Sequence, residues 1–254
     1  MPEPSVGQSA LSQPGRPSSR PRRLPLRRPE IVHVGAACRD IAPDDPRGWR
    51  LGGGVAYAAL TSARLGLRTG AIVGLDDEAA GATELDLLRD ARVDLIRVPL
   101  ARGPVYRNVH TPAGRVQTCF DPGEPLPIPL IPEAWLPAPG WTLAPVADEV
   151  RDGWVAVPPA TSFVALAWQG LLRELAPMTR VTRRPPGPSA LLRRADLVGV
   201  SDQDVARDTT LRSLAALLHP GARLLVNEPL DDTRRAAEAI KARYAAFRAR
   251  MKLS

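Results

Sequence analysis

An alternation of short apolar runs with helical patterns is the feature that most restricts the fold of this 254-residue chain. The runs at residues 31–37, 69–76 and 93–100 are rich in apolar and β-branched side chains, which is typical of buried strands. The two segments between these runs repeat apolar side chains at helical spacing, and Gly66 is placed to end the first helix. Strand, helix, strand, helix, strand predicts a parallel sheet with right-handed crossovers.

The period of the pattern changes after residue 100. Residues 105–110 and 115–120 alternate between apolar and polar side chains on either side of the turn 111–114, which predicts a β-hairpin. A hairpin does not fit the rhythm of a parallel sheet, so we expect it to project as a lid. The proline-rich residues 121–140 are predicted to be a connector over the surface.

The second half of the chain resumes the series. Its expected elements are strands at residues 141–146, 162–170, 195–201 and 222–228, and helices at residues 170–176, 209–219 and 231–254. In the helix at 209–219, we expect Leu211, Leu214, Leu217 and Leu218 to share one apolar face. The expected organisation is therefore a tail at 1–29, a folded domain at 30–230 with the hairpin at about 105–120, and a C-terminal helix at 231–254.

The tail at 1–29 holds Pro, Ser, Gln and Arg and almost no large apolar side chains, so we expect it to be disordered. Its arginines could contact nucleic acid, but no aromatic residues alternate with them to stack on bases, which argues against that partner. Such a contact would weaken steeply with salt and disappear when the tail is removed. The net charge of +7 comes almost wholly from arginine, because Lys241 and Lys252 are the only lysines. This pattern indicates a compositional bias more than a nucleic-acid surface.

Several classes of protein are excluded by composition. No apolar run reaches the roughly 18 residues of a membrane-spanning helix, and the basic N-terminus lacks the apolar core of a secretory signal. Two cysteines, Cys38 and Cys119, suggest no disulfide framework, and three scattered histidines give no zinc-ligand spacing. We therefore expect a cytoplasmic protein that has no membrane contact.

Two motifs follow the first predicted strand. The run "GAACRD" places Asp40 at its end, and an ionised carboxylate there can accept hydrogen bonds from ligand hydroxyls at the carboxyl edge of a parallel sheet. The run "GGGVAYAAL" opens the first helix with Gly52 and Gly53, where missing Cβ atoms allow a ligand to approach the backbone. The tripeptide "RLG" closes the same helix.

These motifs, together with "VGLDDEAAG", "WQGLLRE" and "LVGVSDQDV", resemble the signatures of the ribokinase-like (PfkB) family of carbohydrate kinases. The resemblance extends from about residue 31 to residue 225. It implies a three-layer α/β fold with a Rossmann-like parallel sheet and a small β-hairpin lid. It also implies ATP-dependent phosphoryl transfer, with Mg²⁺, to a hydroxyl of a sugar or related alcohol. The lid of such a kinase can supply a homodimer contact.

The resemblance also assigns site residues. It implies that Asp40, Gly52, Gly53 and Tyr57 bind the acceptor, a small-molecule sugar or nucleoside. Tyr57 stands where the family usually has asparagine, and a phenol and a carboxamide offer different hydrogen-bonding groups. This departure indicates an acceptor other than ribose.

On the nucleotide side, the resemblance places Ser201 and Asp204 at the family's Asn-x-x-Glu motif, where they would contact Mg²⁺ and the nucleotide phosphates. The alternative is a helix N-cap followed by an acidic first turn. For Asp76 and Asp77, we favour helix capping over substrate contact. Gln169 and Arg173 are expected to be structural.

The family's Gly-Ala-Gly-Asp segment, which supplies its catalytic base and a backbone anion hole, is absent from the sequence, and no glycine follows Gly221. We therefore assign no catalytic residue and no metal ligand, and we expect an incomplete C-terminal part and little or no kinase activity. Three explanations stay open. The chain is a truncated or frame-shifted gene product, a non-catalytic descendant that still binds a sugar or nucleoside, or a kinase completed by an unrecognised site or another chain.

Overall fold

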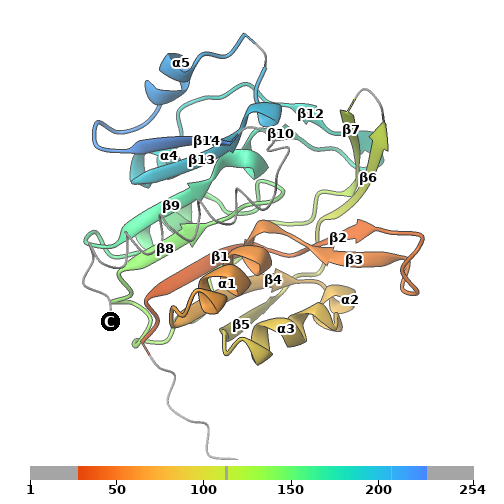
Figure 1. Ribbon diagram of the computed structural model, residues 1–254, viewed down its shortest axis with the longest axis horizontal. Coiled ribbons are helices and arrows are strands. Elements are labelled where there is room, and N and C mark those ends of the chain that lie inside the picture. Colours follow the sequence, from red (N-terminus) through yellow and green to blue (C-terminus); the bar gives the residue numbers. More distant parts are fainter. Residues whose placement is uncertain (1–27, 112–113, 207, 228–254) are drawn as a thin grey trace, which may run out of the picture.

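A seven-stranded parallel sheet forms the centre of the molecule, as the computed structural model shows for the described residues 28–111, 114–206 and 208–227 (Figure 1). Its strands are β1 (Ile31–Ala36), β4 (Thr69–Leu75), β5 (Asp94–Pro99), β8 (Gly140–Leu143), β9 (Phe163–Ala167), β13 (Leu197–Ser201) and β14 (Arg223–Asn227). They lie in the order β14-β13-β9-β8-β1-β4-β5, with every neighbouring pair parallel. The predicted parallel sheet is thus confirmed, and all seven of its strands were expected from the sequence.

Two helical layers cover the faces of this main sheet. One face packs against α1 (Gly54–Arg64), α2 (Asp77–Ala80) and α3 (Glu84–Asp90), with Val55 and Leu85 buried against β4. The other packs against η1 (Asp152–Ala156) and α4 (Ala190–Arg194). Side chains alternate between the two cores as the strand period requires. The arrangement is the expected three-layer α/β architecture.

Short elements surround the carboxyl edge of the sheet. They are η2 (Trp168–Leu171), η3 (Asp202–Asp204), and the antiparallel strand pair β10 (Arg173–Glu174) and β12 (Thr182–Arg183). Helix α5 (Leu211–Ala215) lies in the connection from β13 to β14. The predicted helix at 170–176 is wrong, because the chain there forms η2 and β10. Gly170 explains the difference, since a Cβ at this position would overlap the carbonyl oxygen of Pro145, so the segment lies flat against the loop that follows β8.

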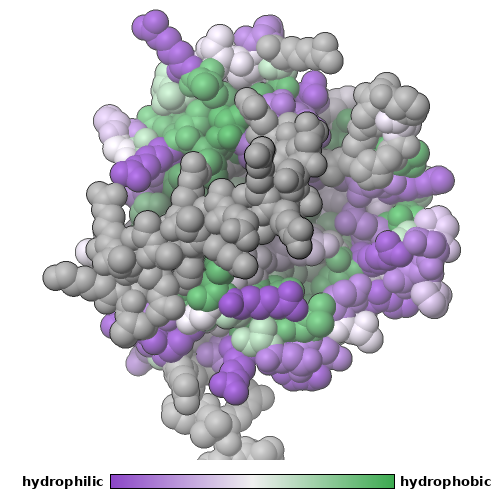
Figure 2. Space-filling model, in the orientation of Figure 1, coloured by the Kyte–Doolittle hydropathy of each residue, from purple (hydrophilic) through white to green (hydrophobic). Residues whose placement is uncertain are grey.

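The predicted helix at 209–219 is shorter than expected. Only Leu211–Ala215 is α-helical, and the next turn is closed by tighter bonds from the N–H groups of Leu217 and Leu218 to carbonyls three residues earlier. Leu214 is buried, whereas Leu211 is exposed instead of sharing its face. Figure 2 shows hydrophobic residues gathered at this end of the molecule, near α5 and β14, and hydrophilic residues over α2 and α3.

The lid is larger than the sequence indicated. The hairpin is confirmed as β6 (Val105–Thr111) and β7 (Gly114–Asp121). It belongs to a five-stranded sheet, the lid sheet, with order β11-β7-β6-β2-β3, whose other strands are β2 (Cys38–Ile41), β3 (Trp49–Gly52) and β11 (Thr179–Arg180). Strands β2 and β3 were missed because each is short and mixes charged with apolar side chains. As a consequence, Asp40 lies inside a lid strand and not in a loop.

The connector at 121–140 is not a purely surface segment. It forms no strand or helix, but Leu126, Trp135 and Ala138 are buried, and Trp135 has no exposed surface. The indole of Trp135 packs on β4, where a Cβ at Gly70 would come within 2.9 Å of the ring. The connector therefore contributes to the core on the η1 side of the main sheet, which corrects the sequence interpretation.

Two expectations lie outside the described residues. They are the disordered tail, apart from residues 28 and 29, and the C-terminal helix at 231–254. In the part of the chain that the structure does describe, no helix combines the length and the apolar character that crossing a membrane requires.

His33 gives the fold a pH dependence. Its side chain in β1 is 2% exposed, and its Nε2 lies 3.0 Å from Ser62 Oγ of α1. Burial lowers the pKa of His33 to about 3. Because the folded-state value lies below the unfolded value, the unfolded chain takes up a proton first as the pH falls. The contribution of His33 to the free energy of unfolding is therefore fully present above about pH 6.5. It is lost as the pH falls toward 3, by up to about 5 kcal/mol.

Urea unfolding at several pH values between 7 and 4 measures this effect. The His33→Gln variant is expected to lose most of the pH dependence in this range, because glutamine does not titrate. Equal slopes for wild type and His33→Gln would contradict the assignment.

Candidate functional site

The lid strands β2 and β3 hold Asp40 next to Gly52. Asp40 lies opposite Arg50, and Gly52 lies opposite Cys38. A Cβ at position 52 would overlap Oδ2 of Asp40 and come within 2.8 Å of Cys38 Sγ. Glycine at this position therefore leaves the half-buried Asp40 carboxylate the space that any side chain would occupy.

Gly53 has a structural reason of its own. Its φ of 107° lies in the region that favours glycine, and it is the N-cap of α1. A Cβ there would lie 2.7 Å from the carbonyl oxygen of Ala36. The close approach of α1 to the end of β1 accounts for this glycine without any ligand.

A row of hydrogen-bonded amides connects Asp40 to the far side of the lid sheet. Asn108 Nδ2 of β6 donates to Asp40 Oδ1 at 3.0 Å, and Gln117 Nε2 of β7 donates to Asn108 Oδ1 at 2.9 Å. The row fixes the orientation of the Asp40 carboxylate. Neither Asn108 nor Gln117 was identified from the sequence; the polar positions in the alternating hairpin were the available signal.

Tyr57 lies beside this group on α1. Its side chain is 62% exposed, and its pKa is raised above the ordinary value first by burial and then by the negative potential of Asp40. The phenol thus remains neutral near neutral pH and can donate a hydrogen bond. The structure brings Asp40, Gly52 and Tyr57 together, as the resemblance implied.

Ser201 and Asp204 form a second group at the carboxyl end of β13. They make a capping box around η3, in which the Asp204 side chain accepts from the backbone N–H of Ser201 at 3.3 Å. Asp204 also accepts from Gln169 Nε2 at 2.9 Å. The capping alternative therefore describes the geometry, and Gln169 positions the Asp204 carboxylate.

Asp76 is engaged elsewhere. Its Oδ1 accepts from the N–H of Ala79 and caps α2, which confirms the favoured interpretation. Its Oδ2 pairs with Arg39 at 2.9 Å and accepts from the N–H of Gly103 at 3.3 Å. Asp77 is the first residue of α2.

A buried carboxylate that sequence reasoning missed stabilises the carboxyl edge of the main sheet. Glu149 is 1% exposed and accepts hydrogen bonds of 2.7–3.2 Å from the backbone N–H groups of Ala36, Val146 and Ala147. Burial raises the pKa of Glu149, and the N–H bonds oppose this rise. Glu149 therefore joins the end of β1 to the loop after β8, immediately behind the lid.

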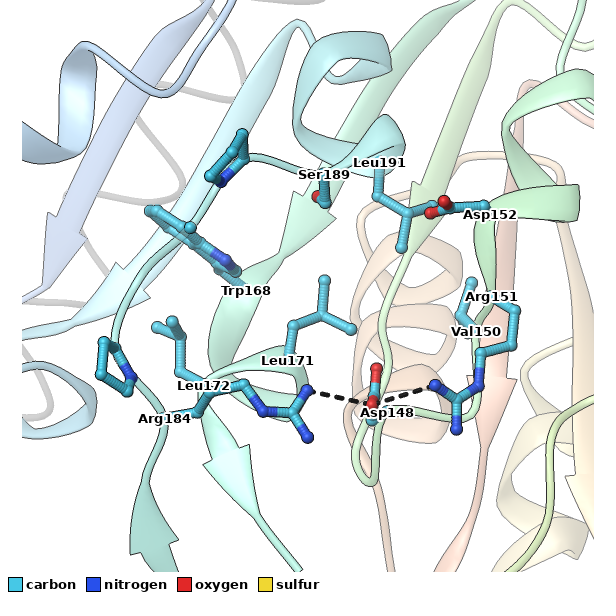
Figure 3. A pocket seen from close by; sticks show the side chains of 13 residues that line it. Asp148, Val150, Arg151, Asp152, Trp168, Leu171, Leu172, Arg184, Ser189 and Leu191 are labelled. Atoms are coloured by element: carbon cyan, nitrogen blue, oxygen red, sulfur yellow. Dashed lines mark hydrogen bonds and ion pairs between the residues drawn. The ribbon is translucent and has the colours of Figure 1, made fainter.

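Several cavities lie near this edge, and two of them are larger than 400 Å³. The first, of about 480 Å³, is lined by Gln117 from the lid sheet and by Asp204 from η3, and Asp204 is the one predicted site residue in its lining. The second, of about 420 Å³, is lined by Trp168, apolar residues and the ion pairs of Asp148 with Arg151 (3.1 Å) and Arg184 (3.0 Å) (Figure 3). The lining of this second cavity includes none of the six predicted site residues.

The described residues were not found to form a metal site of their own. Within the described ranges, no group of three or more His, Cys, Asp or Glu side chains could hold one. Asp204 fits a lesser role, as an outer contact of a hydrated Mg²⁺ that arrives with a phosphate ligand, because magnesium usually keeps several waters. Cys38 and Cys119 are both buried free thiols.

Comparison with known proteins identifies the fold. No family model and no curated protein matches the chain. Among solved structures, a pyrophosphate-dependent kinase in the ribokinase family, complexed with a pyrophosphate analogue and myo-inositol, superposes with a TM-score of 0.59 at 19% identity, covering 78% of this chain and 73% of that one. A pyrophosphate-dependent myo-inositol-1 kinase converted by mutation into a myo-inositol-3 kinase gives 0.58 at 18% identity, covering 78% and 70%. The chain therefore has the ribokinase-like fold.

Proposed function

We propose that this chain binds a small polyhydroxylated molecule, a sugar, cyclitol or nucleoside, at Asp40 of the lid sheet. The observation that carries the proposal is the row Asp40–Asn108–Gln117 beside Gly52. An ionised carboxylate only accepts hydrogen bonds, and each hydroxyl of a polyol can donate one. The two Asp40 oxygens can therefore accept from neighbouring hydroxyls of the same ligand. Charge-assisted bonds of this kind are the stronger ones in proteins.

The residues around Asp40 have distinct roles in this proposal. Asn108 holds the carboxylate in one orientation, and Gly52 leaves room for a ring to approach it. Tyr57 would offer its neutral phenol to a hydroxyl of the same ligand. Tyrosine at this position favours a ligand that places one of its hydroxyls near the phenol on α1.

Our second proposal is phosphoryl transfer, and it is supported by the likeness of the fold to ribokinase-family kinases. Mg·ATP would supply the phosphoryl group, with Asp204 in contact with the hydrated Mg²⁺ and Ser201 near the phosphates. The sequence offers no Gly-Ala-Gly-Asp segment to take the proton from the attacking hydroxyl. We therefore expect binding without appreciable turnover.

The experiment combines binding with a test of turnover. The full chain is titrated with ribose, fructose, myo-inositol and adenosine while its melting temperature is followed. At least one of these polyols is expected to raise the melting temperature in a dose-dependent way. ATP and Mg²⁺ are then added, and phosphorus NMR is used to look for a phosphorylated product.

The two readouts are independent. A melting temperature unaffected by every polyol would contradict the binding proposal. Formation of a sugar phosphate would contradict the expected lack of turnover and would favour the kinase.

A further inference from the structure

The main sheet is buried on both faces at β4 but on only one face at β9 and β13. Every residue of β4 is buried. In β9 and β13, buried residues alternate with exposed or partly exposed ones, and the buried ones belong to the core on the η1 and α4 side. Parallel strands with a neighbour on each side are normally buried on both faces. Among the described residues, this half of the sheet therefore lacks a full layer on its α1 side.

Two glycines show the difference between the halves of the sheet. Gly35 in β1 lies under α1, where a Cβ would come within 3.3 Å of Val55 Cβ. Gly199 in β13 points to the same side, because Val198 beside it belongs to the opposite core. Apart from its chain neighbours, the nearest described atom to a Cβ at Gly199 would be the carbonyl oxygen of Leu166, at 3.9 Å. The layer of α1, α2 and α3 lies over β1, β4 and β5 and does not cover β13 (Figure 1).

The uncovered surface is apolar, and we call it the open face. Ala167, Gly199 and Leu225 are direct partners across β9, β13 and β14, and Ala165 is paired with Leu197 in the next row. The small residues at 165, 167 and 199 allow a helix to approach the sheet closely. Larger side chains border them, and two of these, Phe163 and Leu225, are 40% and 47% exposed. The open face therefore consists of Phe163, Ala165, Ala167, Leu197, Gly199 and Leu225.

The sequence that follows β14 carries a matching pattern. Ile240, Tyr244, Phe247 and Met251 recur at spacings of four, three and four residues, which places them on one stripe of a helix. As a helix, residues 231–254 would be about 36 Å long, roughly twice the length of a five-residue strand such as β13. The segment is thus long enough to cover the open face.

We propose that residues 231–254 form an amphipathic helix that packs its apolar stripe on the open face and completes the main sheet within one chain. Residues 228–230 form a connection of the usual length for a helix that turns back over a parallel sheet. The same short connection gives the segment a high effective concentration at the open face, which favours it over a second copy of the chain. The proposal goes beyond the proposed function, because this packing does not depend on a polyol at Asp40.

Photo-cross-linking of the full chain tests the proposal. Leu225→p-benzoylphenylalanine and Phe163→p-benzoylphenylalanine each place a photoreactive side chain on the open face, and mass spectrometry identifies the peptide that it captures. Mixing unlabelled with nitrogen-15-labelled chains separates cross-links within one chain from those between two. At least one variant is expected to capture a peptide of residues 231–254 from its own chain. Leu87→p-benzoylphenylalanine, at an exposed position of α3, is the control and should not capture that segment.

A pair of charge variants tests the stripe itself. Phe247→Asp is expected to lower the melting temperature of the full chain by about 5 °C or more, because it puts a charge into the buried stripe. Ala249→Asp introduces the same charge on the opposite side of the helix and should lower the melting temperature by no more than about 2 °C. The difference between the two variants therefore reports packing of the stripe and not the added charge.

Three results would overturn the proposal. The first is that neither position on the open face captures residues 231–254. The second is capture of that segment from a second copy only, which would show that the open face is an interface between chains. The third is an equal melting temperature for Phe247→Asp and Ala249→Asp, which would show that the stripe is not packed.

Discussion

Replacing Asp40 with asparagine is expected to weaken polyol binding by about 10- to 100-fold, the range expected when charge-assisted hydrogen bonds are lost. Asparagine keeps the size of the side chain and its contact with Asn108, but it presents one acceptor oxygen and an N–H₂ group in place of two acceptors. The variant should therefore fold and lose affinity. Isothermal titration with the polyol that stabilises the wild type measures the change.

The control for this variant is Asp90→Asn, which removes an exposed carboxylate at the end of α3 and the same unit of charge. It should bind the polyol as the wild type does. Equal affinities for wild type and Asp40→Asn, with both proteins folded, would place the acceptor site elsewhere. Asn108→Leu provides a graded test, because it removes only the group that orients the carboxylate.

The second large effect concerns Glu149. Glu149→Ala is expected to lower the free energy of unfolding by about 3–5 kcal/mol, because it leaves buried N–H groups of Ala36, Val146 and Ala147 without an acceptor. Glu149→Gln should also destabilise, since its amide N–H₂ would meet backbone donors. Urea unfolding monitored by circular dichroism measures both changes.

An exposed glutamate of the connector provides the comparison for this prediction. Glu133→Ala should change the free energy of unfolding by less than about 0.5 kcal/mol, as surface substitutions usually do. A loss for Glu149→Ala no larger than that of Glu133→Ala would show that water replaces the carboxylate without cost. The link between β1 and the loop after β8 would then be dispensable.

The sequence was sufficient for the main sheet and insufficient for the lid. Strands such as β4 are continuous apolar runs, and Gly66 has the positive φ of a helix stop, so local chemistry determined both. Strands β2 and β3 have four residues each and mixed polarity. Strand β2 also pairs with the distant β6, and no local pattern reveals that pairing.

The candidate site likewise contains residues that the local sequence indicated and residues that it did not. Asp40, Gly52 and Tyr57 could be proposed as site residues because each lies within a recognisable local motif. Asn108 and Glu149 were missed, because their importance comes from partners 68 and 113 residues away in the chain. Hydrogen bonds of this range are consequences of the fold, and only the folded structure brings the partners together.

The pairing of Arg173 with Arg183 across β10 and β12 was missed for a related reason. Arg173 was expected to be structural, and the helix predicted at 170–176 would have given it no partner across a strand. Its register opposite Arg183 exists only because the segment forms β10. The error in secondary structure thus concealed that these two arginines lie opposite each other.

Nitrogen–proton NMR of the labelled chain, titrated with the polyol that raises the melting temperature, tests the central claim most directly. We expect the side-chain amide signal of Asn108 and the backbone signal of Gly52 to shift with the ligand concentration, because both groups border the Asp40 carboxylate. Signals of α3 such as that of Arg89 should stay in place. Shifts confined to residues distant from β2 and β6, with Asn108 and Gly52 unchanged, would contradict it.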